Sequence, residues 1–306
     1  MKFILNYKKI NLFLLLIIIG FYNFFFYNNY APITEGWFST YAELIKRNHF
    51  PYKDFYFFLT PFYLLIIESF QNLFGNSLYS LRIFGIFVIV LMSLFLYLIL
   101  NRKYSSFSSF VASIVGIIYY QSGVAHLTYD FTQFLSLFII IHIYLMLLYS
   151  DYKKDTNLVK SSKYQIYLFL SGIFVSLAFL IKQSNGGIIL FFSYFIVLFV
   201  SNDRDSRIRL IDLSLYLLST ILPIFLIMIW LFNHSALSDA FNQIFYMSIS
   251  AKGGLKSIFF GWLHFFNIDF FKQFLVAVLI FGPILSIKFL EAQFPYQKPR
   301  AFIKPF

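Results

Sequence analysis

The chain has 306 residues, of which 60% are hydrophobic and 12% are charged, and its formal net charge at pH 7 is +11. This composition excludes a soluble globular protein, which could not cover so much apolar surface, and indicates a polytopic helical membrane protein. The basic residues stand in small groups between apolar runs, as in cytoplasmic loops, so the positive charge does not indicate nucleic-acid binding.

Eight apolar runs of helical length follow one another along the chain. Because only helices and closed barrels satisfy their backbone polar groups in lipid, we expect an all-α membrane protein with about eight transmembrane helices. The predicted spans are residues 10–27, 77–100, 107–120, 132–149, 165–181, 188–201, 213–232 and 270–290. Residues 1–290 then form one transmembrane domain, and residues 291–306 form a short basic cytoplasmic tail.

The first predicted outer loop, residues 28–76 (loop one), contains two short amphipathic helices. Thr34 can cap the first, which presents one apolar face and cannot continue past Pro51. Thr60-Pro61 starts the second, and Gly75 ends it. Amphipathic helices of this kind lie in the membrane interface, so we expect two interfacial helices here.

The topology depends on whether residues 55–74 cross the membrane. If they do not, the Lys and Arg residues after position 100 divide into thirteen cytoplasmic and four outer, and a ninth span would reverse these numbers. Positive charge in short loops marks the cytoplasmic side, so the eight-span arrangement is favoured, with both termini in the cytoplasm. It places loop one and a fourth outer loop, residues 233–268, on the same face.

Several short motifs occur in a fixed order. Loop one has an acidic residue before Gly and an aromatic, then A-x-L-I, P-Y-x-D-F, P-F-Y, L-F-G-N-S and an Arg that opens the next span. G-I-F-V-S-L-A-F-L-I-K-Q follows at 172–183 and A-K-G-G-L at 251–255. In this order and spacing the chain resembles the protein-O-mannosyltransferase-like (GT-C) membrane glycosyltransferases, bacterial lipopolysaccharide-type branch.

The resemblance implies an enzyme of the cytoplasmic (inner) membrane that takes a sugar from a polyprenyl-phosphate lipid on the outer face. The acceptor would be a lipid, a glycan or a protein, and the partners would be the polyprenyl-phosphate-linked sugar and membrane lipids. Members of this group usually continue through several more spans, so a truncated, inactive homologue is one alternative. A polyprenyl-lipid or sugar transporter, or a flippase component, is another, although a transporter favours ionisable residues at mid-membrane.

Such a transfer needs a carboxylate to take the proton of the acceptor hydroxyl. The resemblance places this role at Glu35, with Asp54 as the second acid of loop one. Many relatives have Asp-Glu where this chain has Thr34-Glu35, so Glu35 is either the base or the neighbour of the catalytic acid. The structural alternatives are a carboxylate in the first turn of a helix for Glu35 and a solvated loop acid for Asp54.

Fixed positive charge must stabilise the departing phosphate. The candidates are Arg82, the pair Lys182-Gln183, and Lys252, which precedes two glycines. Arg82 lies just inside a predicted span and should have an anionic partner, namely Glu68, Asp54 or a lipid phosphate. The structural alternatives are snorkelling to the lipid headgroups for Arg82, capping of a helix C-terminus for Lys182, and a flexible glycine loop for Lys252.

Asp130 precedes the fourth predicted span and matches a family acid that would position the acceptor or a metal; helix capping is its alternative. A divalent metal is therefore the one candidate cofactor. The histidines lack the close spacing of a metal site. We expect His142, in the middle of a span, to form hydrogen bonds inside the bundle.

Overall fold

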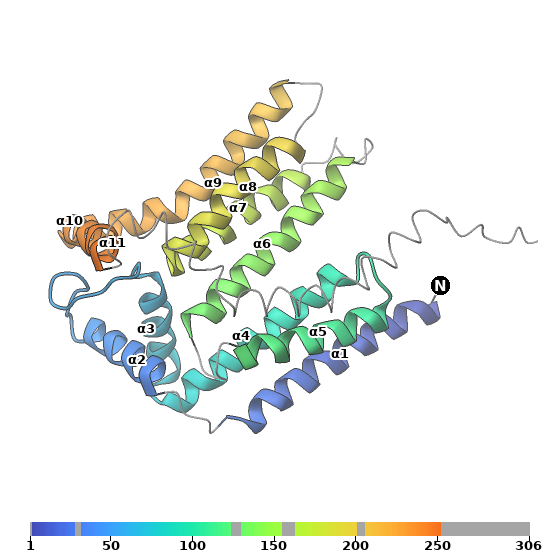
Figure 1. Ribbon diagram of the computed structural model, residues 1–306, viewed down its shortest axis with the longest axis horizontal. Helices are drawn as coiled ribbons and strands as arrows, with labels where there is room; N and C mark the ends of the chain where they lie inside the picture. The colour runs from blue at the N-terminus through green and yellow to red at the C-terminus, as the bar shows by residue number, and fades with distance from the viewer. Residues whose placement is uncertain (1, 28–31, 124–129, 155–162, 201–205, 252–306) are drawn as a thin grey trace, which may run out of the picture. The chain divides into compact units, whose positions relative to one another are not determined.

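The computed structural model describes residues 2–27, 32–123, 130–154, 163–200 and 206–251. These residues form helices and no strand, apart from an isolated bridge between Pro51 and Phe55. The long helices are α1 (Lys2–Phe25), α4 (Leu78–Leu100), α5 (Ser106–Gly123), α6 (Phe131–Lys154), α7 (Lys163–Ile181), α8 (Gln183–Val200) and α9 (Ser206–Asn233) (Figure 1). The short ones are α2 (Pro32–Lys46), α3 (Phe62–Phe74), α10 (Leu237–Phe241), the π-helical turn η1 (Asn242–Met247) and α11 (Ser248–Ala251).

The predicted all-α membrane class is confirmed. Each long helix corresponds to one of the first seven predicted spans, and by length and composition α1, α4, α6, α7 and α9 could cross a membrane. The apolar helices α5 and α8 are shorter than these. The eighth predicted span and the basic tail lie outside the described residues.

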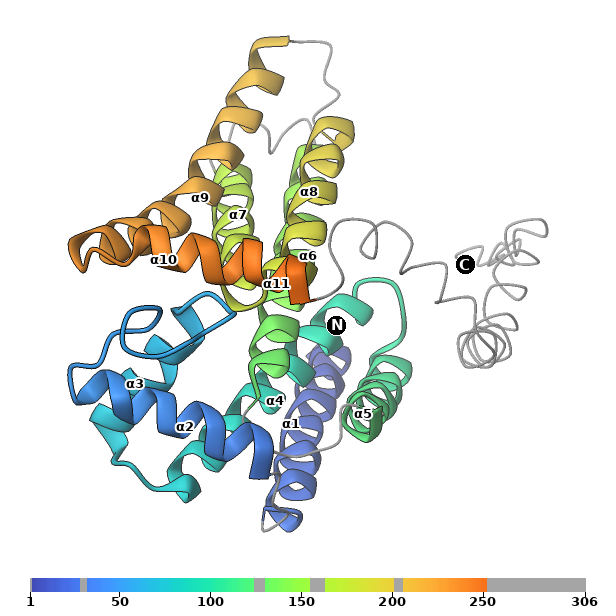
Figure 2. The ribbon, with the colours of Figure 1, turned by 60° about the vertical axis from the view of Figure 1, so that its left-hand side comes forward.

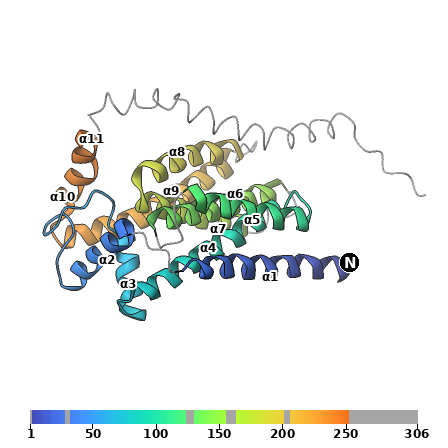
Figure 3. The same cartoon turned by 60° about the horizontal axis from the view of Figure 1, so that its bottom comes forward.

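Loop one leaves the helix bundle and returns to it at the same end. The Tyr27 hydroxyl donates to Tyr79 O at 3.3 Å, and at the other end of the same helix pair the Tyr97 hydroxyl donates to Lys8 O at 3.2 Å. Helices α1 and α4 are therefore antiparallel neighbours (Figure 1, Figure 3). A crossing helix between them would have made them parallel, so α3 does not cross from one end of the bundle to the other.

Both predicted helices of loop one are present. Helix α3 follows Pro61 and ends at Gly75, whose φ of +87° favours glycine. The predicted cap at Thr34 is wrong, because α2 already begins at Pro32. The two helices pack through buried aromatic rings, with Phe38 of α2 edge-on to Tyr63 of α3 at 4.9 Å.

Helices α6 to α9 lie side by side (Figure 2). A Cβ at Gly172 of α7 would lie 1.8 Å from Ser219 Oγ of α9, so only glycine permits this approach. His142 of α6 is 3% exposed and contacts the hydroxyls of Ser171 at 2.8 Å and Ser193 at 2.9 Å. The predicted hydrogen-bonding role of His142 inside the bundle is confirmed, and these polar contacts fix how the helices meet.

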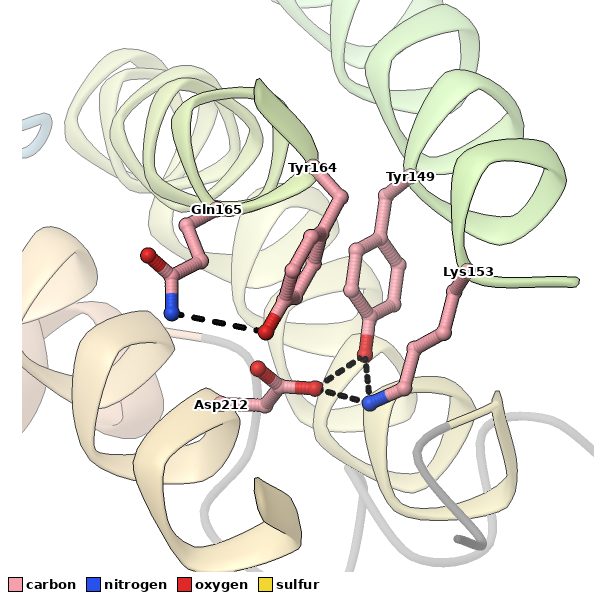
Figure 4. Close-up of polar contacts among 5 residues, drawn as sticks. All are labelled: Tyr149, Lys153, Tyr164, Gln165 and Asp212. Carbon is pink, nitrogen blue, oxygen red and sulfur yellow. Dashed lines mark hydrogen bonds and ion pairs between the residues drawn. The ribbon is translucent and has the colours of Figure 1, made fainter. Parts of the chain in front are cut away.

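At the end of the bundle opposite loop one, Lys153 of α6 forms an ion pair with Asp212 of α9 (Figure 4). The two side chains are only 4% and 0% exposed, and the Tyr149 hydroxyl donates to the same Asp212 oxygen at 2.9 Å. The sequence places Lys153 in a polar turn, but it lies in the last turn of α6. Its charge is therefore neutralised inside the fold rather than exposed at the surface.

Candidate active site

Three separate parts of the chain meet at the loop-one end of the bundle. Thr60 donates its hydroxyl to Leu180 O, and Gln183 Nε2 donates to Phe58 O at 3.0 Å, which joins loop one to the corner between α7 and α8. The Phe50 ring stacks on His234, which follows α9, with ring centroids 4.0 Å apart. Figure 2 shows the loop between α2 and α3 extending toward α10.

The corner between α7 and α8 is a single residue, Lys182. The sequence predicted a turn through Gly187 and a helix from 188, but α8 begins five residues earlier, at Gln183. A Cβ at Gly186 would lie 2.4 Å from the backbone of Phe179, so the glycine permits close packing of the two helices rather than a loop. Such a short corner fixes where the Lys182 side chain starts.

The Lys182 ammonium group lies 5.4 Å from the centroid of the Phe131 ring. The Phe131 ring lies at the start of α6. Its centroid is 5.5 Å from that of Phe38 in α2 and 6.3 Å from that of Tyr63 in α3. Among the described residues no carboxylate lies within ion-pair distance of Lys182. A cation held over an aromatic ring in this way keeps its N–H donors for a further anion.

The other predicted partner of the phosphate in this corner, Gln183, uses one amide hydrogen for Phe58 O. Its Oε1 atom is buried, with no hydrogen-bond donor among the described residues. Gln183 therefore ties loop one to the corner beside Lys182. Its direct contact with phosphate stays a prediction.

Arg82 of α4 is 6% exposed, and its Nη1 donates to Tyr27 O at 3.0 Å. This burial within the protein is unlike the snorkelling alternative. The two acids predicted as its partners have local contacts: Asp54 accepts from Phe50 N, and Glu68 accepts from Asn72 one turn later. Arg82 thus joins α4 to the end of α1 at the base of loop one.

The two described acids of the predicted site both have structural contacts. Asp130 Oδ1 accepts from Thr132 N at 3.0 Å and so caps the start of α6. Asp54 is exposed and closes the turn that begins at Phe50. Neither contact decides between a catalytic and a structural role.

Glu35 lies in the first turn of α2, and its side chain lies outside what the structure describes. Two aromatic residues that follow Glu35 pack against the residues around Lys182, and we call this group the aromatic cluster. The ring centroids of Trp37 and Phe58 are 5.5 Å apart, and the Phe38 ring contacts Phe131. Lys252 lies outside the described residues. The described residues contain no group of three His, Asp or Glu side chains that could hold a metal ion.

An apolar groove of about 540 Å³ begins beside this cluster. It lies between α3, α4, α7 and α9, and Leu180, two residues before Lys182, is part of its wall. Its lining is almost wholly hydrocarbon, with Ser69 as the polar exception. The lining residues are Phe62, Leu65, Ile66, Ser69, Phe70, Leu73, Phe84, Leu177, Leu180, Pro223, Leu226 and Ile227. The groove therefore suits an apolar chain.

A family model described as dolichyl-phosphate-mannose-protein mannosyltransferase matches residues 59–230, more than half of the chain. The chain belongs to this family. No curated protein and no solved structure matches it. The membership confirms the resemblance at the level of the family, and with it a multi-pass membrane protein of the glycosyltransferase class.

The part matched to the mannosyltransferase family contains the groove and four of the predicted site residues, Arg82, Asp130, Lys182 and Gln183. Glu35, Asp54 and Lys252 lie outside it. Sequence reasoning missed the groove and the roles of Thr60 and Phe131. For α3 a signal was present in its composition, because Phe62–Phe74 contains more apolar residues than the structure buries.

Proposed function

We propose that this chain is a membrane glycosyltransferase that moves a sugar from a polyprenyl-phosphate donor to a lipid, glycan or protein acceptor. One observation carries the proposal within the family: the apolar groove is lined by Leu180, which stands two residues along the chain from a lysine that has no carboxylate partner among the described residues. A polyprenyl-phosphate has the same two parts, a long apolar chain and a single anionic end. The groove would hold the apolar chain of the donor, and the lysine would bind its anionic end.

In the proposed reaction the acceptor hydroxyl attacks the anomeric carbon, and the bond from that carbon to the phosphate oxygen breaks. Glu35 takes the hydroxyl proton, with Asp54 as the second acid of the loop. Lys182 and Arg82, helped by Gln183 and Lys252, stabilise the negative charge that collects on the phosphate. Asp130 positions the acceptor or a divalent metal.

We place the reaction on the outer face of the cytoplasmic membrane, with both termini in the cytoplasm. The support is the excess of Lys and Arg in the turns at the opposite end of the bundle. The antiparallel pairing of α1 and α4 also supports this placement, because it makes loop one an excursion from one face. The whole predicted site then faces the outer leaflet, where a lipid-linked donor can enter sideways.

Replacing Lys182 tests the proposal. With purified protein and polyprenyl-phosphate sugars, wild type should release polyprenyl phosphate, and Lys182→Gln should lower kcat about 100- to 1,000-fold. Lys53→Gln removes an exposed lysine from loop one and is the matched control, which should keep wild-type turnover. Equal activity of the two variants, or a wild type that neither binds nor cleaves any such donor, would contradict the proposal.

A further inference from the structure

The side chain of Gln243, in η1, forms hydrogen bonds to two backbone groups of loop one. Its Nε2 donates to Tyr52 O at 2.7 Å, and its Oε1 accepts from Phe57 N at 3.0 Å. Tyr52 and Phe57 belong to the same hairpin, residues 50–57, which is joined by the bond from Tyr52 N to Phe55 O at 2.9 Å. One amide thus pairs with this hairpin as a neighbouring strand would.

The hairpin needs such support because its backbone is strained. Tyr52 has a φ of +74°, a backbone conformation that residues other than glycine rarely adopt. Its hydroxyl donates to Leu59 O at 2.6 Å, and burial raises the pKa of Tyr52 well above its ordinary value, which keeps that donor protonated. The next residues, Lys53 and Asp54, are exposed and add little packing. External contacts therefore decide whether the hairpin keeps this shape.

The same stretch of loop one continues directly into the candidate active site. Just after Phe57, the backbone of Phe58 accepts from Gln183, and Thr60 donates to Leu180 O. Loop one is thus held by a glutamine on each side, Gln243 after α9 and Gln183 beside Lys182. A shift at the hairpin would move Asp54 and would also reach the corner that carries Lys182.

We propose that Gln243 is a positioning residue, whose amide holds the hairpin 50–57 in the geometry that sugar transfer requires. This inference rests on the proposed function above. It assigns a role to Gln243 itself, which takes no part in the reaction but sets the shape of the loop that carries Asp54.

Gln243→Glu tests the role through pH. A protonated glutamic acid keeps both bonds, since its hydroxyl donates to Tyr52 O, whereas the carboxylate loses that donor and repels the carbonyl oxygen. The charged groups on the adjoining elements are Asp239 in α10 and Lys53 and Asp54 in the hairpin, and the control variant below keeps all three. Relative to the control, kcat/KM should therefore fall on the order of 10- to 100-fold at pH 8 and recover at pH 5.

The matched control is Asn242→Asp, which makes the same amide-to-acid change at the neighbouring, exposed residue. It carries the same titrating neighbours, including His234, so any difference belongs to position 243. Gln243→Met keeps the length without either bond and should lower kcat/KM at both pH values. If Gln243→Glu follows the control at all pH values, the proposal is overturned.

A second measurement separates the clamp from the reaction. The chain has no cysteine, so Tyr56→Cys, at a 49% exposed position of the hairpin, can carry a single nitroxide label. In the labelled protein, the further substitution Gln243→Glu should make the label mobile at pH 8 and restricted at pH 5. The substitution Asn242→Asp should leave the mobility of the label unchanged. Unchanged mobility would overturn the clamp. A responsive label in a protein whose wild type transfers no sugar would overturn only the proposed function.

Discussion

Lys182 is the only residue between α7 and α8, and its ammonium group lies over the ring of Phe131. The sequence identified this lysine through the K-Q motif, but it could not place the ring, which comes from another helix about fifty residues earlier. Motifs select residue types along the chain, whereas the partner of a side chain depends on tertiary packing. For the same reason the sequence missed Thr60 and Gln243, whose bonds are to backbone groups and leave no local pattern.

Glu35→Gln should abolish sugar transfer while the protein still inserts in the membrane and binds donor lipid. An amide cannot take the proton from the acceptor hydroxyl, but it keeps the shape of the side chain. The measurement is turnover beside donor binding in the same preparation. Thr34→Asp restores the acid pair of many relatives and should be tolerated. Retained turnover in Glu35→Gln would move the role of base to Asp54.

At the scale of the element, the ends of α3 were predictable because Pro61 and Gly75 act locally, one by its fixed φ and the other by its positive φ. The start of α8 was not predictable from the sequence. Residues 183–187 are polar and rich in glycine, which indicates a turn by composition. The approach of Phe179, a tertiary contact, explains the glycine at 186 instead.

Gly186→Ala should destabilise the protein by about 1–3 kcal/mol, as overpacking of a close contact does. The added Cβ would lie 2.4 Å from the Phe179 backbone, which cannot move without shifting α7. Gly187→Ala is the control, because its Cβ would meet the Phe179 ring at 3.5 Å, an ordinary contact. Thermal unfolding in detergent measures both variants. Equal unfolding temperatures would show that α7 and α8 do not meet so closely.

For the whole molecule, composition and the charge in the loops were enough to predict the all-α membrane class and the first seven helices. The groove was beyond prediction, because α3, α4, α7 and α9 contribute its walls from positions up to about 165 residues apart. The lone buried ion pair described near the opposite end, Lys153 with Asp212, was also missed. Both residues look like loop charges until the lengths of α6 and α9 are known.

Orientation in the membrane is a further prediction at this scale. Reporter fusions at Ser206 and Asn267 should report the cytoplasm and the exterior, respectively. The reason is the charge distribution, with thirteen Lys and Arg residues after position 100 on one side and four on the other. The opposite pair of results would place loop one, and with it the candidate site, in the cytoplasm.

The central claim, that the donor lies in the groove with its phosphate at Lys182, can be measured by photocrosslinking. A polyprenyl-phosphate with a diazirine on the isoprene unit nearest the phosphate is activated on the purified protein, and labelled peptides are identified by mass spectrometry. Labels should fall on the groove walls near the corner, in Phe62–Phe70 and Leu177–Leu180, and unlabelled donor should suppress them. Labels confined to the outward faces of α1 or α8, and unaffected by that competition, would contradict the claim.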